Sequence, residues 1–306
     1  MGTPDFAVAT LQALIEVHYP IVGVITAPDK PAGRGRKLKQ SAVKEYALKQ
    51  NLHILQPTNL KSSDFLDALH DLKADLQIVV AFRMLPKQVW SMPKFGTFNL
   101  HASLLPDYRG AAPINWAVIN GETKTGVTTF FINEKIDTGG ILLQKEIEIS
   151  PTISAGELHD KLMVVGSELV VQTVQLIQNN TYQTINQPET DLKPAPKLNK
   201  ENCKIDWNQS LNQIFNHIRG LSPYPAAYSS IYSNNETIEV KIYKTLKIEE
   251  KHHYPLGKIL FTKKEIKVAV KNGFINVLEL KLAGKRKMDS KSLLNGYAFS
   301  ENAKMI

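Results

Sequence analysis

Three side chains with chemical potential stand in the middle of the sequence. Asn99 and His101 are two residues apart at the end of an apolar run, and Asp137 begins an Asp-Thr-Gly-Gly segment further on. Alternate side chains of a strand point to the same side, so a strand here would direct Asn99 and His101 into one site. The glycines after Asp137 let the backbone approach closely, so its carboxylate could fold back on the imidazole.

This trio suits acyl transfer to an amine that a substrate supplies. An imidazole titrates near neutrality, and a neighbouring carboxylate can hold its protonated form. No serine or cysteine nucleophile is required, because Asn99 and protonated His101 could stabilise the tetrahedral oxyanion. On spacing alone a structural interpretation stays open, in which Asn99 caps a turn, His101 is a satisfied strand-end histidine and Asp137 starts a turn.

Other chemical motifs are missing from the sequence. Gly33-Arg34-Gly35 lacks the third glycine of a dinucleotide-binding loop, and we find no phosphate-loop lysine, zinc-protease helix or nucleophile elbow. His252-His253 has no cysteine or acidic partners, so we expect no metal site. Four acidic residues have the spacing of a solvated helix face: Asp64, Asp67, Asp71 and Asp75.

The elements that position the trio follow the pattern of an α/β domain. Short apolar runs alternate with segments of helical period, which predicts a doubly wound, mostly parallel, Rossmann-like sheet. Ligands bind such sheets at the carboxyl ends of the strands, where Asn99 and His101 stand. The predicted strands are 21–25, 76–80, 97–100, 127–132 and 140–149, and the predicted helices are 4–15, 41–50, 62–72 and 154–178.

A second domain follows a polar, proline-bearing segment. We predict a catalytic domain over residues 1–181, a linker over 182–200 and a small OB-like β-barrel over 201–306. The barrel domain should contain a helix at 210–219 and strands at 227–232, 238–243, 257–261, 266–270 and 274–280.

The first recognisable element is a helix, whereas a doubly wound domain normally begins with a strand. We therefore expect either that the sheet lacks its usual first strand or that the natural chain starts upstream of Met1.

Charge divides the chain more sharply than composition does. Of 306 residues, 43% are apolar, enough for two folded domains. Residues 1–199 have 19 basic and 19 acidic side chains, whereas residues 200–306 have 18 and 10 and carry the whole net charge of +8. A polyanionic partner, either nucleic acid or a membrane surface, is therefore expected for the C-terminal part. Lys285-Arg286-Lys287 is a candidate contact.

Compartment and assembly can also be predicted. The single cysteine excludes an internal disulfide, and no apolar run approaches the roughly 18 to 20 residues that span a bilayer. We expect a cytoplasmic monomer that makes no membrane insertion.

A family resemblance gives these residues roles. Asn99-x-His101-x-Ser103-Leu104-Leu105-Pro106, followed by Asp137-Thr138-Gly139, resembles the signature of the folate-dependent formyltransferases. The resemblance implies 10-formyltetrahydrofolate as co-substrate, no metal, and Asn99, His101 and Asp137 as the catalytic residues. It also implies that Ser103, Leu104, Leu105 and Pro106 line the folate site, with Val80 to Leu85 as a second wall.

Within that family, Tyr108 to Trp116 and Ile218 to Pro225 are similar to the members that formylate methionyl-initiator tRNA. This branch uses a basic loop to reach the acceptor stem of the tRNA. Without the resemblance a solvated lysine-rich loop is the plainer interpretation, but the resemblance implies that Arg34, Arg36 and Lys37 contact tRNA here. Two alternatives remain: a related enzyme that formylates a sugar amine or glycinamide ribonucleotide, and a non-catalytic RNA-binding module, which the intact trio disfavours.

Overall fold

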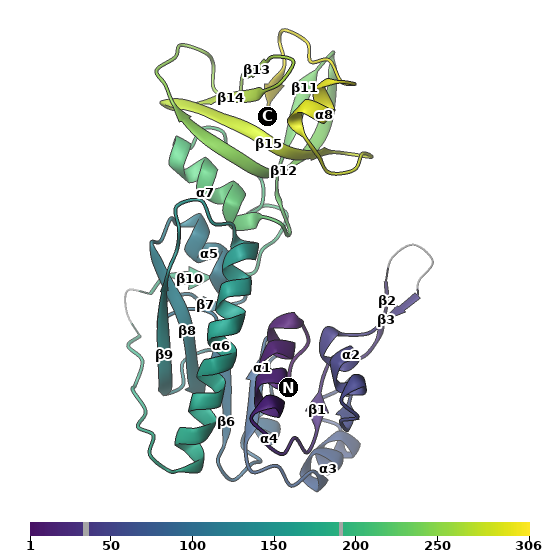
Figure 1. Ribbon diagram of the computed structural model, residues 1–306, viewed down its shortest axis with the longest axis vertical. Coiled ribbons are helices and arrows are strands. Elements are labelled where there is room, and N and C mark those ends of the chain that lie inside the picture. The colour runs from purple at the N-terminus through teal and green to yellow at the C-terminus, as the bar shows by residue number, and fades with distance from the viewer. Residues whose placement is uncertain (33–36, 190–191) are drawn as a thin grey trace. The chain divides into compact units, whose positions relative to one another are not determined.

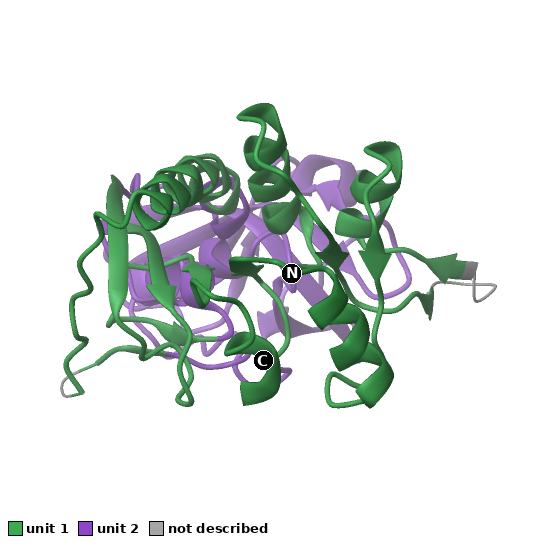
Figure 2. Cartoon of the chain, turned by 90° about the horizontal axis from the view of Figure 1, so that it is seen from below, with its two compact units in different colours: residues 1–110, 125–147, 159–194 green, residues 111–124, 148–158, 195–306 purple. Residues whose placement is uncertain are grey.

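The computed structural model describes residues 1–32, 37–189 and 192–306 (Figure 1). The chain forms two compact units (Figure 2). Unit 1 comprises residues 1–110, 125–147 and 159–194, and unit 2 comprises 111–124, 148–158 and 195–306. Two segments from the first half of the sequence therefore pack with the C-terminal residues.

The described elements alternate in unit 1 and are mostly strands in unit 2. The helices are α1 (Asp5–Glu16), α2 (Ala42–Lys49), α3 (Ser63–Asp71), α4 (Lys87–Trp90), α5 (Pro113–Ile119), α6 (Ala155–Gln178), α7 (Leu211–Leu221) and α8 (Ser290–Leu294). The strands up to the C-terminal sheet are β1 (Val24–Ile25), β2 (Lys30–Ala32), β3 (Lys37–Lys39), β4 (Ile54–Leu55), β5 (Gln77–Val80), β6 (Thr97–His101), β7 (Arg109–Gly110), β8 (Lys124–Phe131), β9 (Ile141–Glu148) and β10 (Pro194–Ala195). That sheet is built from β11 (Ala227–Ser233), β12 (Glu236–Glu249), β13 (Ile259–Phe261), β14 (Ile266–Val270), β15 (Gly273–Leu282), β16 (Met288–Asp289) and β17 (Lys304–Met305).

The main sheet of unit 1 has the strand order β5-β6-β8-β9. β5 and β6 are parallel, whereas β8 runs antiparallel to β6. The buried side chains of Phe98 and Leu100 hold β6 in the core, and α6 packs closely on it, because a Cβ at Gly166 would lie 2.9 Å from Leu100 Cδ2. The predicted Rossmann-like class is confirmed, and β6 delivers its carboxyl end to the edge where ligands bind.

The sheet of unit 1 is divided in two. β1 pairs with β4 in a separate parallel sheet, and among the described residues Met1 and Gly2 bridge the gap toward β5. The Gly2 amide donates to Ile25 O at 3.0 Å, and the Met1 amino group donates to Ile78 O at 2.6 Å. Met1 and Gly2 therefore form a two-residue bridge between the two parallel pairs of strands.

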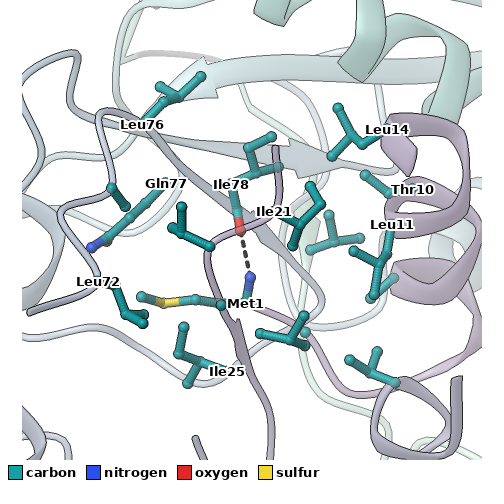
Figure 3. Close-up of a pocket in the computed structure, with 18 of the residues that line it drawn as sticks. Met1, Thr10, Leu11, Leu14, Ile21, Ile25, Leu72, Leu76, Gln77 and Ile78 are labelled. Atoms are coloured by element: carbon teal, nitrogen blue, oxygen red, sulfur yellow. Dashed lines mark hydrogen bonds between the residues drawn. The ribbon is translucent and has the colours of Figure 1, made fainter. Parts of the chain in front are cut away.

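An apolar pocket of about 140 Å³ lies beside this bridge (Figure 3). Burial in it lowers the pKa of the Met1 amino group to about 5. The strand predicted over 21–25 is paired only at Val24 and Ile25, and residues 21–23 line the pocket instead. Further lining residues come from α1, from the segment between α3 and β5, and from the first residue of β5: Thr10, Leu11, Leu14, Leu72, Leu76 and Gln77.

Unit 2 is built on an antiparallel sheet of order β13-β14-β15-β12-β11-β17, with β16 on β15. α7 supplies one apolar face to its core, and a capping box formed by Ser210 and Gln213 starts that helix. All five predicted strands are present, and the OB-like class is confirmed. The predicted end of the second strand at 243 is wrong, because β12 continues to Glu249 past register shifts between Ile242 and Thr245.

No helix in the described part of the chain is both long and apolar enough to cross a membrane.

Candidate active site

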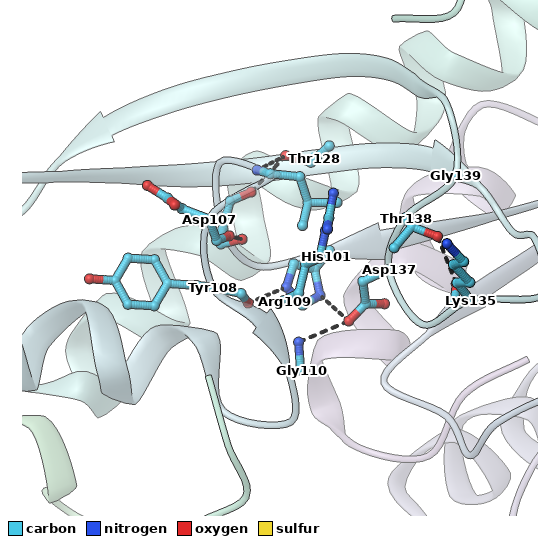
Figure 4. Close-up of polar contacts among 12 residues, drawn as sticks. His101, Asp107, Tyr108, Arg109, Gly110, Thr128, Lys135, Asp137, Thr138 and Gly139 are labelled. Atoms are coloured by element: carbon cyan, nitrogen blue, oxygen red, sulfur yellow. Dashed lines mark hydrogen bonds and ion pairs between the residues drawn. The ribbon is translucent and has the colours of Figure 1, made fainter. Parts of the chain in front are cut away.

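His101 and Asp137 meet at the carboxyl end of β6 (Figure 4). His101 Nδ1 lies 3.9 Å from Asp137 Oδ2, and the two side chains are only 7% and 14% exposed. His101 Nε2 lies 2.8 Å from the carbonyl oxygen of Tyr108, which can only accept. Nε2 therefore carries a proton, and Nδ1 is the nitrogen that can exchange one.

The backbone around Asp137 holds its carboxylate in place. The Gly110 amide donates to Asp137 Oδ2 at 3.0 Å. Asp137 itself adopts a left-handed conformation with φ of 54°, a strain found often at functional sites. At Gly139 a Cβ would lie 1.6 Å from the Phe131 carbonyl oxygen, so only glycine fits this turn. The loop predicted to return the carboxylate to the imidazole does so.

Asn99 stands two residues before His101 on β6, where alternate side chains share a side. Its Oδ1 is buried and has no hydrogen-bond partner among the described residues. An unpaired buried acceptor costs about 1–3 kcal/mol, and a donor on a bound ligand would remove that cost. The Oδ1 atom of Asn99 is therefore available to accept a hydrogen bond from a polar group of a ligand.

The segment from Ser103 to Pro106 follows β6 directly. Ser103 Oγ donates to Asp107 O at 2.7 Å, and the Leu105 amide donates to Thr128 Oγ1 at 3.1 Å. Thr128 Oγ1 in turn donates to Ser103 O, and Gln144 Nε2 donates to Leu105 O at 2.8 Å. Ser103 and Leu105 are buried, whereas Leu104 and Pro106 are partly accessible. These bonds fix one side of the site.

The second predicted wall begins at the carboxyl end of β5. Val80 and Leu85 are buried, and Met84 between them is 70% exposed. β5 and β6 are parallel neighbours, so residues 81–85 leave the sheet at the same edge as His101 at the end of β6. A buried amide oxygen without a partner among the described residues, together with an accessible apolar segment at the same edge, fits a ligand with a polar reacting group and an apolar body.

In residues 1–32, 37–189 and 192–306, no three His, Cys, Asp or Glu side chains lie close enough together to bind a metal ion. The tRNA residues predicted at Arg34 and Arg36 lie outside the described residues. Lys37 begins β3, and its backbone pairs with Ala32.

The Lys285-Arg286-Lys287 segment of unit 2 is exposed. Lys285 Nζ lies 5.6 Å from the centre of the Tyr297 ring, and Lys287 Nζ lies 4.9 Å from that of Tyr243. Nearby in the sheet, Lys241 and Lys281 stand directly opposite each other on β12 and β15. Like charges across strands destabilise a sheet, so an anionic partner would stabilise this surface.

Sequence reasoning missed the groups that orient the pair. The Tyr108 carbonyl and the Gly110 amide act through the backbone, so side-chain identity gives no signal for them. Thr128 and Gln144 lie on β8 and β9, within segments already predicted as strands, and their inward position could have been inferred from alternation.

The sequence of this chain is similar to those of known proteins along its whole length. Residues 1–174 match the family described as formyl transferase, and residues 197–298 match its C-terminal domain. The chain is 61% identical to the methionyl-tRNA formyltransferase of Flavobacterium johnsoniae over 306 residues, covering 100% of this chain and 97% of that protein. It is 54% identical to that of Bacteroides thetaiotaomicron over 311 residues, with 100% and 97% covered.

The fold has solved relatives as well. WlaRD, a sugar 3N-formyl transferase whose crystal structure was determined in the presence of dTDP and 5-N-formyl-THF, superposes with a TM-score of 0.66. The two chains are 23% identical, and the match covers 93% of this chain and 97% of that one. This likeness supports the two-part fold described above.

Proposed function

Because the chain belongs to the formyl transferase family, we propose that it transfers a formyl group from 10-formyltetrahydrofolate to the amino group of methionyl-initiator tRNA. The names of its full-length relatives support the tRNA acceptor. The observation that carries the chemistry is the buried approach of His101 to Asp137, with the Asn99 amide two residues before His101 on the same strand.

The co-substrate supplies the formyl carbon. As the methionyl amine adds to it, Asn99 and protonated His101 stabilise the developing oxyanion. At 3.9 Å the Asp137 carboxylate lies beyond hydrogen-bond distance of His101 Nδ1, so it acts through its charge and leaves that N–H free for the substrate. The C–N bond to tetrahydrofolate then breaks, and the proton lost by the amine reaches the leaving nitrogen through Nδ1.

The folate body would lie between two walls. Leu104 and Pro106 offer their partly accessible side chains from one side, and residues 81–85 offer theirs from the other. The bonds from Thr128 and Gln144 keep the first wall rigid, which reduces the entropy lost on binding. No metal takes part in this scheme.

The tRNA would be held by two positive regions. Arg34, Arg36 and Lys37 form one, and Lys285, Arg286 and Lys287 form the other. Phosphate contacts by such side chains position an RNA without reading its sequence. We place this work in the cytoplasm and assign it to a monomer.

The test is a comparison of acceptors. Purified protein and 10-formyltetrahydrofolate are incubated with charged initiator tRNA, charged elongator tRNA, a dTDP-linked amino sugar and glycinamide ribonucleotide. We expect kcat/KM for charged initiator tRNA to exceed that for either small amine by about 10³-fold or more, because only the tRNA offers a long row of phosphates to basic side chains. A preference for a small amine would overturn the proposal, and absence of any transfer with retained RNA binding would favour a non-catalytic module.

A further inference from the structure

The segment predicted as a linker is bonded to the loops of the active site. Ile185 and Ile141 exchange two backbone hydrogen bonds of 2.9 Å, which fixes the segment beside the start of β9. Further along, the Lys193 amide donates to Asp107 Oδ1 at 3.1 Å, and the Tyr108 amide donates to Lys193 O at 2.6 Å. The segment therefore touches both the loop 107–110 and the start of the strand that follows the Asp137 loop.

Gln187 joins the two loops through one side chain. Its Oε1 accepts from Arg109 Nε at 3.1 Å and from Arg109 Nη2 at 2.8 Å. Its Nε2 donates to the Gly139 carbonyl oxygen at 2.8 Å. A guanidinium can only donate and a carbonyl can only accept, so both ends of the amide are assigned without ambiguity. No other side-chain type offers an acceptor and a donor at this length.

Both partners of Gln187 lie within two residues of the catalytic pair or of a group that orients it. Arg109 lies between Tyr108, whose carbonyl oxygen accepts from His101, and Gly110, whose amide donates to Asp137. Gly139 is two residues beyond Asp137 in its turn. We propose that Gln187 is a positioning residue that sets the separation of His101 and Asp137 by tying the loop 107–110 to the turn 137–139. Its effect on rate rests on the proposed function.

The variant Gln187→Met keeps the length of the side chain and removes both interactions. A displaced catalytic group costs far more in turnover than in binding, so kcat should fall about tenfold while KM for folate and for charged tRNA changes less than about twofold. Gln187→Glu keeps the acceptor for Arg109 but cannot donate to Gly139, so it should not restore kcat. Gln183→Met, on the same segment at an exposed glutamine, is the matched control and should retain the wild-type rate.

Two readouts separate positioning from general structural support. In the Asp137→Asn background, Gln187→Met should reduce kcat by less than about twofold, because the pair it positions is already lost. Independently of activity, hydrogen exchange at the Gly110 amide should accelerate about fivefold or more in Gln187→Met and stay unchanged in Gln183→Met.

The proposal is overturned if Gln187→Met keeps its kcat and its Gly110 exchange rate, or if the two substitutions reduce kcat independently. If wild-type protein formylates no acceptor yet Gly110 exchange responds as expected, the positioning role stands and the proposed function fails.

Discussion

The loops of the candidate active site in unit 1 and the sheet surface of unit 2 both carry charged side chains, but the two regions differ in how exposed those side chains are. The side chains of His101 and Asp137 are at most 14% exposed, and backbone groups from Tyr108 and Gly110 fix them. The Lys287–Glu279 pair of unit 2 is 48% and 35% exposed. Buried, fixed charges act strongly on a reacting centre, whereas exposed charges act weakly and are screened by salt.

From this contrast we infer that the candidate active site of unit 1 sets the rate of formyl transfer and that the surface of unit 2 sets the affinity for RNA. A change at the site loops should alter turnover with little effect on salt dependence. A change on the unit 2 surface should alter the salt-dependent binding of RNA with little effect on the chemical step.

The largest expected effect is that of Asp137→Asn. The substitution keeps the size of the side chain and an acceptor for the Gly110 amide but removes the charge beside the imidazole. Single-turnover formyl transfer should fall about 10²- to 10³-fold, because a protonated His101 loses its stabilising partner. The control is Glu134→Gln, which breaks an exposed pair with Lys87 and should leave the rate unchanged. Equal rates in both variants would remove Asp137 from the mechanism.

Gly139→Ala should have the next largest effect. Its Cβ would meet the Phe131 carbonyl oxygen at 1.6 Å, so the backbone of the turn must shift and carry Asp137 with it. A displacement near 1 Å can cost about 10²-fold in rate. At Gly140 the three atoms nearest to an added Cβ all belong to the exposed Thr184 side chain, the first at 2.9 Å, so Gly140→Ala should lose much less activity. Similar losses in the two variants would contradict a specific role for this turn.

Removing two exposed charges from unit 2 should have a smaller effect of another kind. In Lys285→Gln with Arg286→Gln, the slope of log Kd for tRNA against log salt should fall in magnitude by about 1 to 2, with about 5- to 20-fold weaker binding at low salt. The rate from saturated complex should stay near that of wild type. An unchanged slope, measured by filter binding across a salt series, would exclude this segment from the RNA contact.

The smallest expected effect concerns stability. Burial lowers the pKa of His217 from its ordinary 6.5, and its Nε2 has no partner within the described residues. Above pH 6.5 the ring is neutral in both states. Below pH 6.5 the imidazole of the unfolded chain is protonated, whereas that of the folded chain stays neutral. The free energy of unfolding therefore falls as the pH is lowered toward the folded-state pKa, by about 1.4 kcal/mol in total for each unit by which burial lowers that pKa.

His217→Gln should therefore flatten part of this dependence. Urea unfolding of the two proteins at pH 5.5 and 7.5 measures it. A wild-type loss of stability at low pH that persists in the variant would mean that another group is responsible.

Much of this contrast could be read from residue types and spacing. The placement of Asn99 and His101 on one strand and the return of Asp137 on its loop were predictable, because alternation in a strand and glycine after Asp137 are local signals. The extent of β12 was not, because the bulge near Lys244 interrupts the alternation on which strand prediction depends. The hydrogen-bond partners of His101 and Asp137 could not be predicted from the sequence, because they are backbone groups. The role of Gln187 could not be predicted either, because its hydrogen-bond partners Arg109 and Gly139 lie 78 and 48 residues away in the sequence.

The central claim is that His101 acts in the chemical step and not in holding the RNA. Single-turnover formyl transfer and tRNA affinity, measured on wild type and His101→Ala, test it most directly. The claim predicts a rate lower by about 10²- to 10⁴-fold with Kd for charged tRNA within about twofold of wild type. A rate near that of wild type, or a loss explained by weaker tRNA binding, would contradict it.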